Sequence, residues 1–155
     1  MQLPFQVLST VHTGITVADL PKANAFFTQV LGFKPVSEGH LASGEFIDNL
    51  VGVPEAELDY VVIEAPGHRI ELLEYLAPRE RFIIKPRSCD VGSVHLAFCV
   101  AGLDALLARA KAFGWHAVGH VQTVTNGPKN GTRAVYVRSE DGVTIEFQEP
   151  PSQHT

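Results

Sequence analysis

The chain has 155 residues, a formal net charge of -5 and 19% charged residues. This length suits a single domain (1–155), and a domain of this size buries roughly 68–70% of the surface of its unfolded chain. The mild acidity and the absence of a basic stripe exclude the charge pattern of proteins that bind nucleic acid or anionic membranes. We therefore expect a small-molecule substrate, with no nucleic acid and no membrane as partner.

Cysteine usage and targeting signals bear on the compartment. Cys89 and Cys99 are too few for a disulfide framework and form no CxxC motif. No run of about 18 apolar residues occurs, and the N-terminus lacks a basic region followed by a long apolar stretch. We expect a cytoplasmic protein.

The sequence contains an internal repeat, which is the first pattern to search for because it decides the fold. "VHTGITVADL" begins at residue 11, and "VHLAFCVAGL" begins at residue 94. Each is followed by a glycine-aromatic pair, and each half ends in a similar strand, "RIELLEY" at 69–75 and "TIEFQEP" at 144–150. The two halves are therefore predicted to share one fold.

In chain order, the first half predicts a strand and a helix that begins after Asp19, with Pro21 in its first turn, and ends at Gly32. Three more strands follow, and a long insertion forms a lid or a short helix. The predicted ranges are strand 11–17, helix 21–31, strand 33–37, insertion 39–57, strand 59–65 and strand 69–75.

The second half repeats this order, with Gly114 ending its helix. The predicted ranges are strand 93–100, helix 103–113, and strands 115–124, 132–138 and 143–149. The result is an α+β protein with two βαβββ modules, residues 8–76 and 93–150, joined by a linker over 77–92.

Alternation along the first strand of each half places each histidine among small residues. His12 shares its face with Gly14 and Thr16, and His95 shares its face with Ala97 and Cys99. A face of this kind is not filled by its own strand and leaves room for a ligand. The opposite faces are expected to pack on the helices through Val11, Thr13, Ile15 and Val17, and through Val94, Leu96, Phe98 and Val100.

The strands that end the two halves carry Glu71 and Glu146, each flanked by apolar residues. With His12 and His95 they form a candidate metal site of two imidazoles and two carboxylates. This donor set suits Mn, Fe(II), Co, Ni or Zn rather than Ca.

Each of these residues also has an ordinary structural interpretation. A single histidine in an apolar strand is usually a hydrogen-bonded core residue, and a single glutamate near a strand end is usually solvated. The coincidence of two histidines and two glutamates at matching positions of a repeat favours the metal site, since an unpaired carboxylate among apolar residues is costly.

The other histidines fit a metal site less well. His116 and His120 lie on a predicted strand, where four residues span roughly 13 Å, too far for two ligands of one ion. His40 is kept as a pocket residue. Cys99 is expected at the floor of the cavity, where it contacts the substrate without acting as a nucleophile, because no cation adjoins it.

The chain resembles the vicinal oxygen chelate superfamily, which includes glyoxalase I, methylmalonyl-CoA epimerase, extradiol dioxygenases and bleomycin-resistance proteins. The resemblance extends over essentially the full length. It rests on "VHTGITVADLPKANAFFTQVLGF", "HRIELLEY", "GSVHLAFCVAGLDALLARAKAFGW" and "GTRAVYVRSEDGVTIEFQEP". It implies a cup-shaped mixed sheet around one divalent metal ion, helices outside, and ligands at His12, Glu71, His95 and Glu146. We also expect a homodimer.

The presence of a fourth ligand, Glu71, favours glyoxalase I and the epimerases over the three-ligand ferrous dioxygenases of this fold. The implied activity is metal-dependent proton transfer through an enolate, in a lyase or isomerase whose substrate chelates the metal through two neighbouring oxygens. Glu146 or Glu71 is the expected base. A ferrous dioxygenase and a non-catalytic antibiotic-binding protein remain as alternatives.

Substrate contacts are expected from Arg133 and Tyr136, on the strand after the glycine-rich loop, and from Glu45 in the insertion. No recognisable glutathione or coenzyme A site identifies the substrate.

Overall fold

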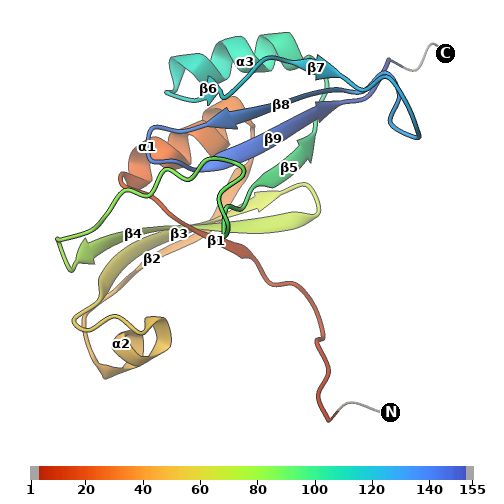
Figure 1. The fold of residues 1–155 in the computed structure, drawn as a ribbon. Coiled ribbons are helices and arrows are strands. Elements are labelled where there is room, and N and C mark those ends of the chain that lie inside the picture. Colours follow the sequence, from red (N-terminus) through yellow and green to blue (C-terminus); the bar gives the residue numbers. More distant parts are fainter. Residues whose placement is uncertain (1–3, 153–155) are drawn as a thin grey trace.

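The computed structural model describes residues 4–152 and shows two structural repeats, each built around one small sheet (Figure 1). The elements of the first repeat are β1 (Thr13–Thr16), α1 (Leu20–Ala25), the π-helix η1 (Phe26–Val30), β2 (Lys34–Leu41), α2 (Glu45–Val51), β3 (Glu57–Ala65) and β4 (His68–Ala77). The elements of the second are β5 (Leu96–Cys99), α3 (Leu103–Ala112), β6 (His116–Ala117), β7 (Gln122–Thr123), β8 (Arg133–Arg138) and β9 (Thr144–Glu149).

The two sheets have equivalent strand orders. The first runs β1-β4-β3-β2, and the second runs β5-β9-β8-β6, with β7 also paired to β8. In each sheet the first strand is an edge strand, parallel to the last strand of its repeat, and the other pairs are antiparallel. The predicted α+β class is confirmed, with the strands arranged in two separate mixed sheets.

Local sequence explains where the first helix begins and ends. The Asp19 side chain accepts a hydrogen bond of 2.8 Å from the N–H of Lys22, as an N-cap residue does, and Pro21 lies in the first turn. Gly32 follows the helical segment with φ of 72°, a left-handed conformation that glycine adopts without steric cost. The predicted helix 21–31 is therefore present, but its second half is a π-helix.

The helix-bearing faces of both sheets share one hydrophobic core. The core contains Phe26 and Phe27 of η1, Leu103 and Ala110 of α3, and Trp115. Ile70 and Leu72 contribute from the first sheet, and Ile145 and Phe147 from the second. The rings of Phe26 and Trp115 stack with centroids 3.9 Å apart. Because neighbouring residues of a strand face opposite ways, Glu71 and Glu146 lie on the faces turned away from this core.

A second, smaller core lies under the insertion. Ile47 of α2 packs with Ala56 and Leu58, and with Leu73 and Tyr75 on the face of the first sheet that carries Glu71. The predicted short helix of the insertion is thus present as α2. It covers the far end of that face, beyond Glu71.

Some predicted boundaries were wrong. The strands that follow the histidines begin later than predicted, at Thr13 and Leu96. Val11 and Val94, which were expected to pack on the helices, are 70% and 74% exposed. The predicted strand 115–124 is two short strands separated by residues 118–121, and β2 extends to Leu41.

Within residues 4–152, no helix is both long and apolar enough to span a bilayer. Cys89 and Cys99 are both free and exposed.

Candidate metal centre

The first candidate pair joins β1 and β4. These strands are parallel and Gly14 is in register with Glu71, so His12, two residues before Gly14, lies beside the glutamate on the same face. His12 Nε2 is 3.2 Å from Glu71 Oε2. Both side chains are partly exposed, which leaves the pair accessible to an ion from solvent.

The second pair repeats this geometry. Ala97 of β5 is in register with Glu146 of β9, and His95, two residues before Ala97, has its Nε2 3.3 Å from Glu146 Oε2. The sequence repeat is therefore a repeat of side-chain geometry, with one imidazole and one carboxylate in each half.

The surroundings of the two pairs differ in polarity. Tyr136, opposite Glu146 on β8, places its hydroxyl 3.3 Å from His95 Nε2, and Gln148 donates a hydrogen bond of 2.7 Å to Glu146 Oε1. At the corresponding positions around Glu71, the first sheet carries Val62 and Leu73. One half of the candidate site is thus polar and the other is apolar.

Each pair has the donor types and spacing of two ligands of one ion. Nitrogen and oxygen ligands about 2.0–2.2 Å from an ion lie about 3 Å apart in adjacent positions, close to the separations of 3.2 and 3.3 Å found here. Across residues 4–152, however, no three His, Cys, Asp or Glu side chains gather closely enough to hold a metal ion. The structure brings the four predicted ligands together as two pairs and leaves a single four-ligand centre as a prediction.

His95 also lines a cavity of about 260 Å³ between the two edge strands β1 and β5. Gly14 and Thr16, which were predicted to leave room beside the histidines, line it too. The two sheets therefore approach each other within one chain along their edges.

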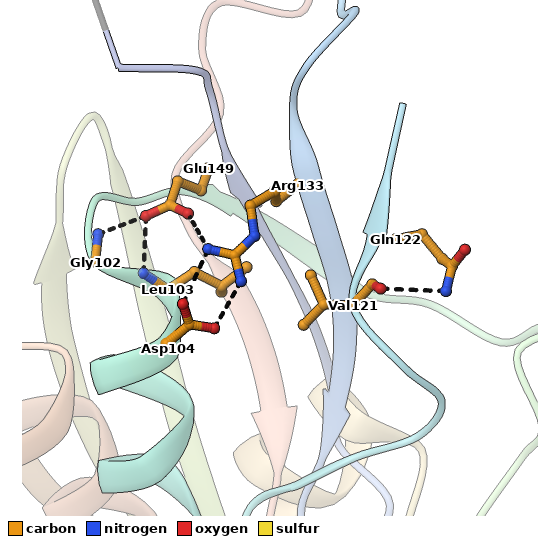
Figure 2. A network of polar contacts seen from close by, with 7 residues as sticks. All are labelled: Gly102, Leu103, Asp104, Val121, Gln122, Arg133 and Glu149. Atoms are coloured by element: carbon orange, nitrogen blue, oxygen red, sulfur yellow. Dashed lines mark hydrogen bonds and ion pairs between the residues drawn. The ribbon is translucent and has the colours of Figure 1, made fainter. Parts of the chain in front are cut away.

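Arg133, which was predicted to contact the substrate, lies on the opposite face of β8 from Tyr136. Its side chain lies on the same face of β8 as the buried Val135 and Val137, and this face is turned toward α3. There its guanidinium donates hydrogen bonds to Asp104 at 2.6 Å and to Glu149 at 2.8 Å (Figure 2). We therefore leave Arg133 out of the candidate site.

Arg133 contacts two carboxylates at the N-terminus of α3. This helix has no hydrogen bond from the side chain of its own N-cap residue. Glu149 of β9 supplies the acceptor, because its Oε1 lies 2.7 Å from the N–H of Gly102 and 2.9 Å from that of Leu103. The Leu103 N–H is the main cause of a pKa of Glu149 below its ordinary value, and Arg133 lowers the pKa of Asp104.

The remaining predicted residues lie outside the pairs. Glu45 is exposed on the first turn of α2, and Cys99 is exposed at the end of β5. His40 of β2 has its Nδ1 2.7 Å from Asp59 Oδ1 and its Nε2 3.4 Å from Glu57 Oε1. None of these three residues contacts either His–Glu pair through a hydrogen bond or ion pair.

Two residues of the second pair's surroundings were missed as functional candidates. Gln148 was identifiable from sequence as a neighbour of Glu146, because residues two apart on a strand share one face. Lys129, whose Nζ donates a hydrogen bond of 2.8 Å to Gln148 Oε1, comes from the glycine-rich loop over 125–132. No sequence pattern indicates where a lysine on such a loop points.

A family model described as the Glyoxalase/Bleomycin resistance protein/Dioxygenase superfamily matches residues 9–147. The chain belongs to this superfamily. This confirms the resemblance inferred from the repeat, and the matched region includes both His–Glu pairs.

Individual relatives agree with this membership. A 2-epi-5-epi-valiolone epimerase from an Actinomyces species is 32% identical over 148 residues, which cover 91% of this chain and 79% of that protein. A glyoxalase family protein from Bacillus cereus has the same fold, with a TM-score of 0.83 and 22% identity over 98% of this chain and 100% of that one.

A more distant structural relative contains a metal. The fosfomycin resistance protein FosX from Listeria monocytogenes, complexed with Mn(II) and sulfate, has a TM-score of 0.54 and 18% identity, and 93% of each chain is covered. A protein of this fold therefore binds Mn(II).

Proposed function

We propose that this protein is a divalent-metal-dependent epimerase that acts on a small ketone carrying a neighbouring hydroxyl. The observation that carries the proposal is the duplicated His–Glu pair, with nitrogen-to-oxygen distances of 3.2 and 3.3 Å. The epimerase named among its relatives, at 32% identity, favours epimerisation over the other reactions of the superfamily.

Four side chains would hold the metal: His12 and Glu71 from the first repeat, and His95 and Glu146 from the second. A bound divalent ion would supply Lewis-acid polarisation of the substrate carbonyl, which lowers the pKa of the adjacent C–H. Mn, Co, Ni, Zn and Fe(II) all suit this mixed donor set.

Epimerisation removes a proton from one face of a carbon and returns a proton to the other face. The two glutamates suit this task, because Glu71 and Glu146 come from different repeats and can approach the carbon from opposite sides. One carboxylate, once released from the ion, would accept the C–H proton, and the other, released and protonated from solvent, would deliver a proton to the opposite face. Tyr136, beside His95, is placed to donate a hydrogen bond to a substrate oxygen.

We further propose that the complete centre is shared by two chains of a homodimer. Within one chain the Glu-bearing faces point away from the common core, and among residues 4–152 no three ligating side chains gather. An apolar segment that precedes His12 is also exposed, including Phe5, Val7 and Leu8 at 67%, 83% and 85%. A second copy that covers this segment would bring His12 and Glu71 of one chain to His95 and Glu146 of the other.

Proton exchange with solvent tests the proposed reaction. Manganese-loaded protein incubated with 2-epi-5-epi-valiolone in D₂O should wash deuterium into the carbon beside the ketone and form the epimer, and a chelator should stop both. Glu146→Gln and Glu71→Gln should each lower the rate by about 10²–10⁴-fold, the usual contribution of a positioned acid or base.

Other outcomes would identify a different function. Oxygen consumption with a catechol-like substrate would indicate the dioxygenase alternative. Ligand binding that is indifferent to metal and to His95→Ala would indicate a binding protein. Either result, without deuterium exchange, would overturn the epimerase proposal.

A further inference from the structure

The two glutamates of the candidate centre are held differently. Glu146 is contacted at both carboxylate oxygens: Gln148 Nε2 donates to Oε1 at 2.7 Å, and Oε2 lies 3.3 Å from His95 Nε2. For Glu71, the polar side-chain contacts within residues 4–152 are limited to His12. The position two residues after each glutamate accounts for the difference, because it is Gln148 on β9 and Leu73 on β4.

Lys129 fixes the orientation of the Gln148 amide. A lysine ammonium group can only donate hydrogen bonds, so the Gln148 atom 2.8 Å from Lys129 Nζ must be the carbonyl oxygen. The NH₂ group is then directed at Glu146, which as a carboxylate can only accept. The two contacts determine each other, and the usual ambiguity of an amide side chain does not arise.

The backbone of the glycine-rich loop presents Lys129 in a defined position. The N–H of Thr132 donates to the carbonyl of Lys129 at 2.9 Å, and the N–H of Gly131 donates to the carbonyl of Val124 at 2.8 Å. These bonds close the loop at its base. Lys129 therefore reaches Gln148 from a turn that is already formed.

We propose that Gln148 and Lys129 are positioning residues that hold the Glu146 carboxylate with Oε2 beside His95, ready to bind the metal, and that this chain of contacts couples the loop over 125–132 to metal binding. The proposal rests on the proposed function for the metal itself. Its physical basis is that a ligand held by a fixed hydrogen-bond partner loses less freedom when it binds a metal, so such partners commonly change affinity by about 10- to 100-fold.

Metal affinity of the full-length protein tests the proposal without any substrate. The metal-free protein is titrated with Mn(II) in the presence of a competing chelator. Gln148→Leu, which copies the residue at the corresponding position of the first repeat, should weaken Mn(II) binding by about 10- to 100-fold. Lys129→Met should weaken it less, and Lys129→Arg, which keeps a donor, should restore it.

Lys111→Met is the matched control, because Lys111 is an exposed lysine on α3, away from the second pair. It should bind Mn(II) as the wild type does. Lys129 is also exposed, so its replacement tests the proposal even if Gln148→Leu disturbs folding.

Hydrogen exchange of the loop is a second measurement, which a purely structural role would not change. Saturating Mn(II) should slow amide exchange over 126–131 in the wild type and in Lys111→Met, and should do so much less in Gln148→Leu.

Wild-type Mn(II) affinity in both Gln148→Leu and Lys129→Met would overturn the positioning role while leaving the proposed function intact. A wild type that binds Mn(II) normally but exchanges no deuterium into the substrate would overturn only the epimerase. A wild type that does not bind Mn(II) would overturn both.

Discussion

At the scale of single residues, the candidate centre depends on where each histidine sits relative to an edge strand. His12 and His95 each lie two residues before the residue in register with a glutamate on the neighbouring parallel strand. This offset brings each imidazole to within 3.2 or 3.3 Å of a carboxylate oxygen. The two pairs are equivalent in their side chains, but differ in what surrounds them.

Removing either histidine should weaken metal binding more than removing a residue that only positions a ligand. We expect His12→Ala and His95→Ala each to lower Mn(II) affinity by more than about 100-fold, the upper range for outer partners of a metal ligand. His120→Ala is the control, because His120 is exposed outside both pairs. Titration of the metal-free proteins measures this, and equal affinities for the three variants would contradict the assignment.

The two His–Glu pairs were predictable from sequence because the repeat marks them, whereas the residues around each pair were only partly predictable. His12, Glu71, His95 and Glu146 were identified from matching positions of two similar halves. The alternation of side chains along β8 places Arg133 with the buried Val135 and Val137, on the face opposite Tyr136. The alternation of side chains along a strand does not identify Lys129, which lies in a loop. Its contact with Gln148 depends on how the glycine-rich loop closes.

At the scale of elements, η1 joins the two repeats through aromatic packing. Phe26 is fully buried and stacks on Trp115, which follows α3. Phe26→Ala should therefore lower the free energy of unfolding by about 3–5 kcal/mol, the usual cost of removing a buried phenylalanine. Phe46→Ala on α2, where the ring is 73% exposed, should change it by no more than about 0.5 kcal/mol. Urea unfolding compares the two, and equal losses would contradict this account of the core.

The N-terminus of α3 should make stability depend on pH. The Leu103 N–H lowers the pKa of Glu149 in the folded protein, so the unfolded chain binds more protons at pH values between the folded and unfolded pKa. The contribution of Glu149 to stability is complete at pH values well above its unfolded pKa of about 4.3, and it is lost as pH falls through its folded pKa.

Glu149→Gln should remove part of this dependence. Urea unfolding between pH 6 and pH 3 should show a smaller loss of stability in Glu149→Gln than in the wild type. Glu38→Gln, at an exposed position on β2, should retain the wild-type dependence. A Glu149→Gln curve parallel to that of the wild type would show that the cap does not contribute.

At the scale of the whole molecule, the arrangement of the two repeats was not predictable from sequence. The pattern predicts two similar sheets with their helices on the faces away from the glutamates, and this is observed. The same pattern fits a single chain whose sheets form one cup and a chain whose sheets share a core and turn their glutamates outward. In the structure, residues of both sheets, such as Ile70 and Phe147, share one core with Phe26.

A shared centre predicts that two defective chains complement each other. When His12→Ala and His95→Ala chains are unfolded together and refolded, a mixed dimer should have one site with both histidines and one with neither. About a quarter of the wild-type Mn(II) capacity should return, because about half of randomly paired dimers are mixed. No recovery, in dimers shown by mass spectrometry to be mixed, would place each centre within one chain.

The most direct test of the account is the metal content of the wild-type protein purified without chelators. We expect one divalent ion per chain, lost on dialysis against a chelator together with deuterium exchange into the substrate, and recovered with both when Mn(II) is added. A protein that is purified without metal and binds none on addition of Mn(II), Co(II), Ni(II), Zn(II) or Fe(II) would contradict the account.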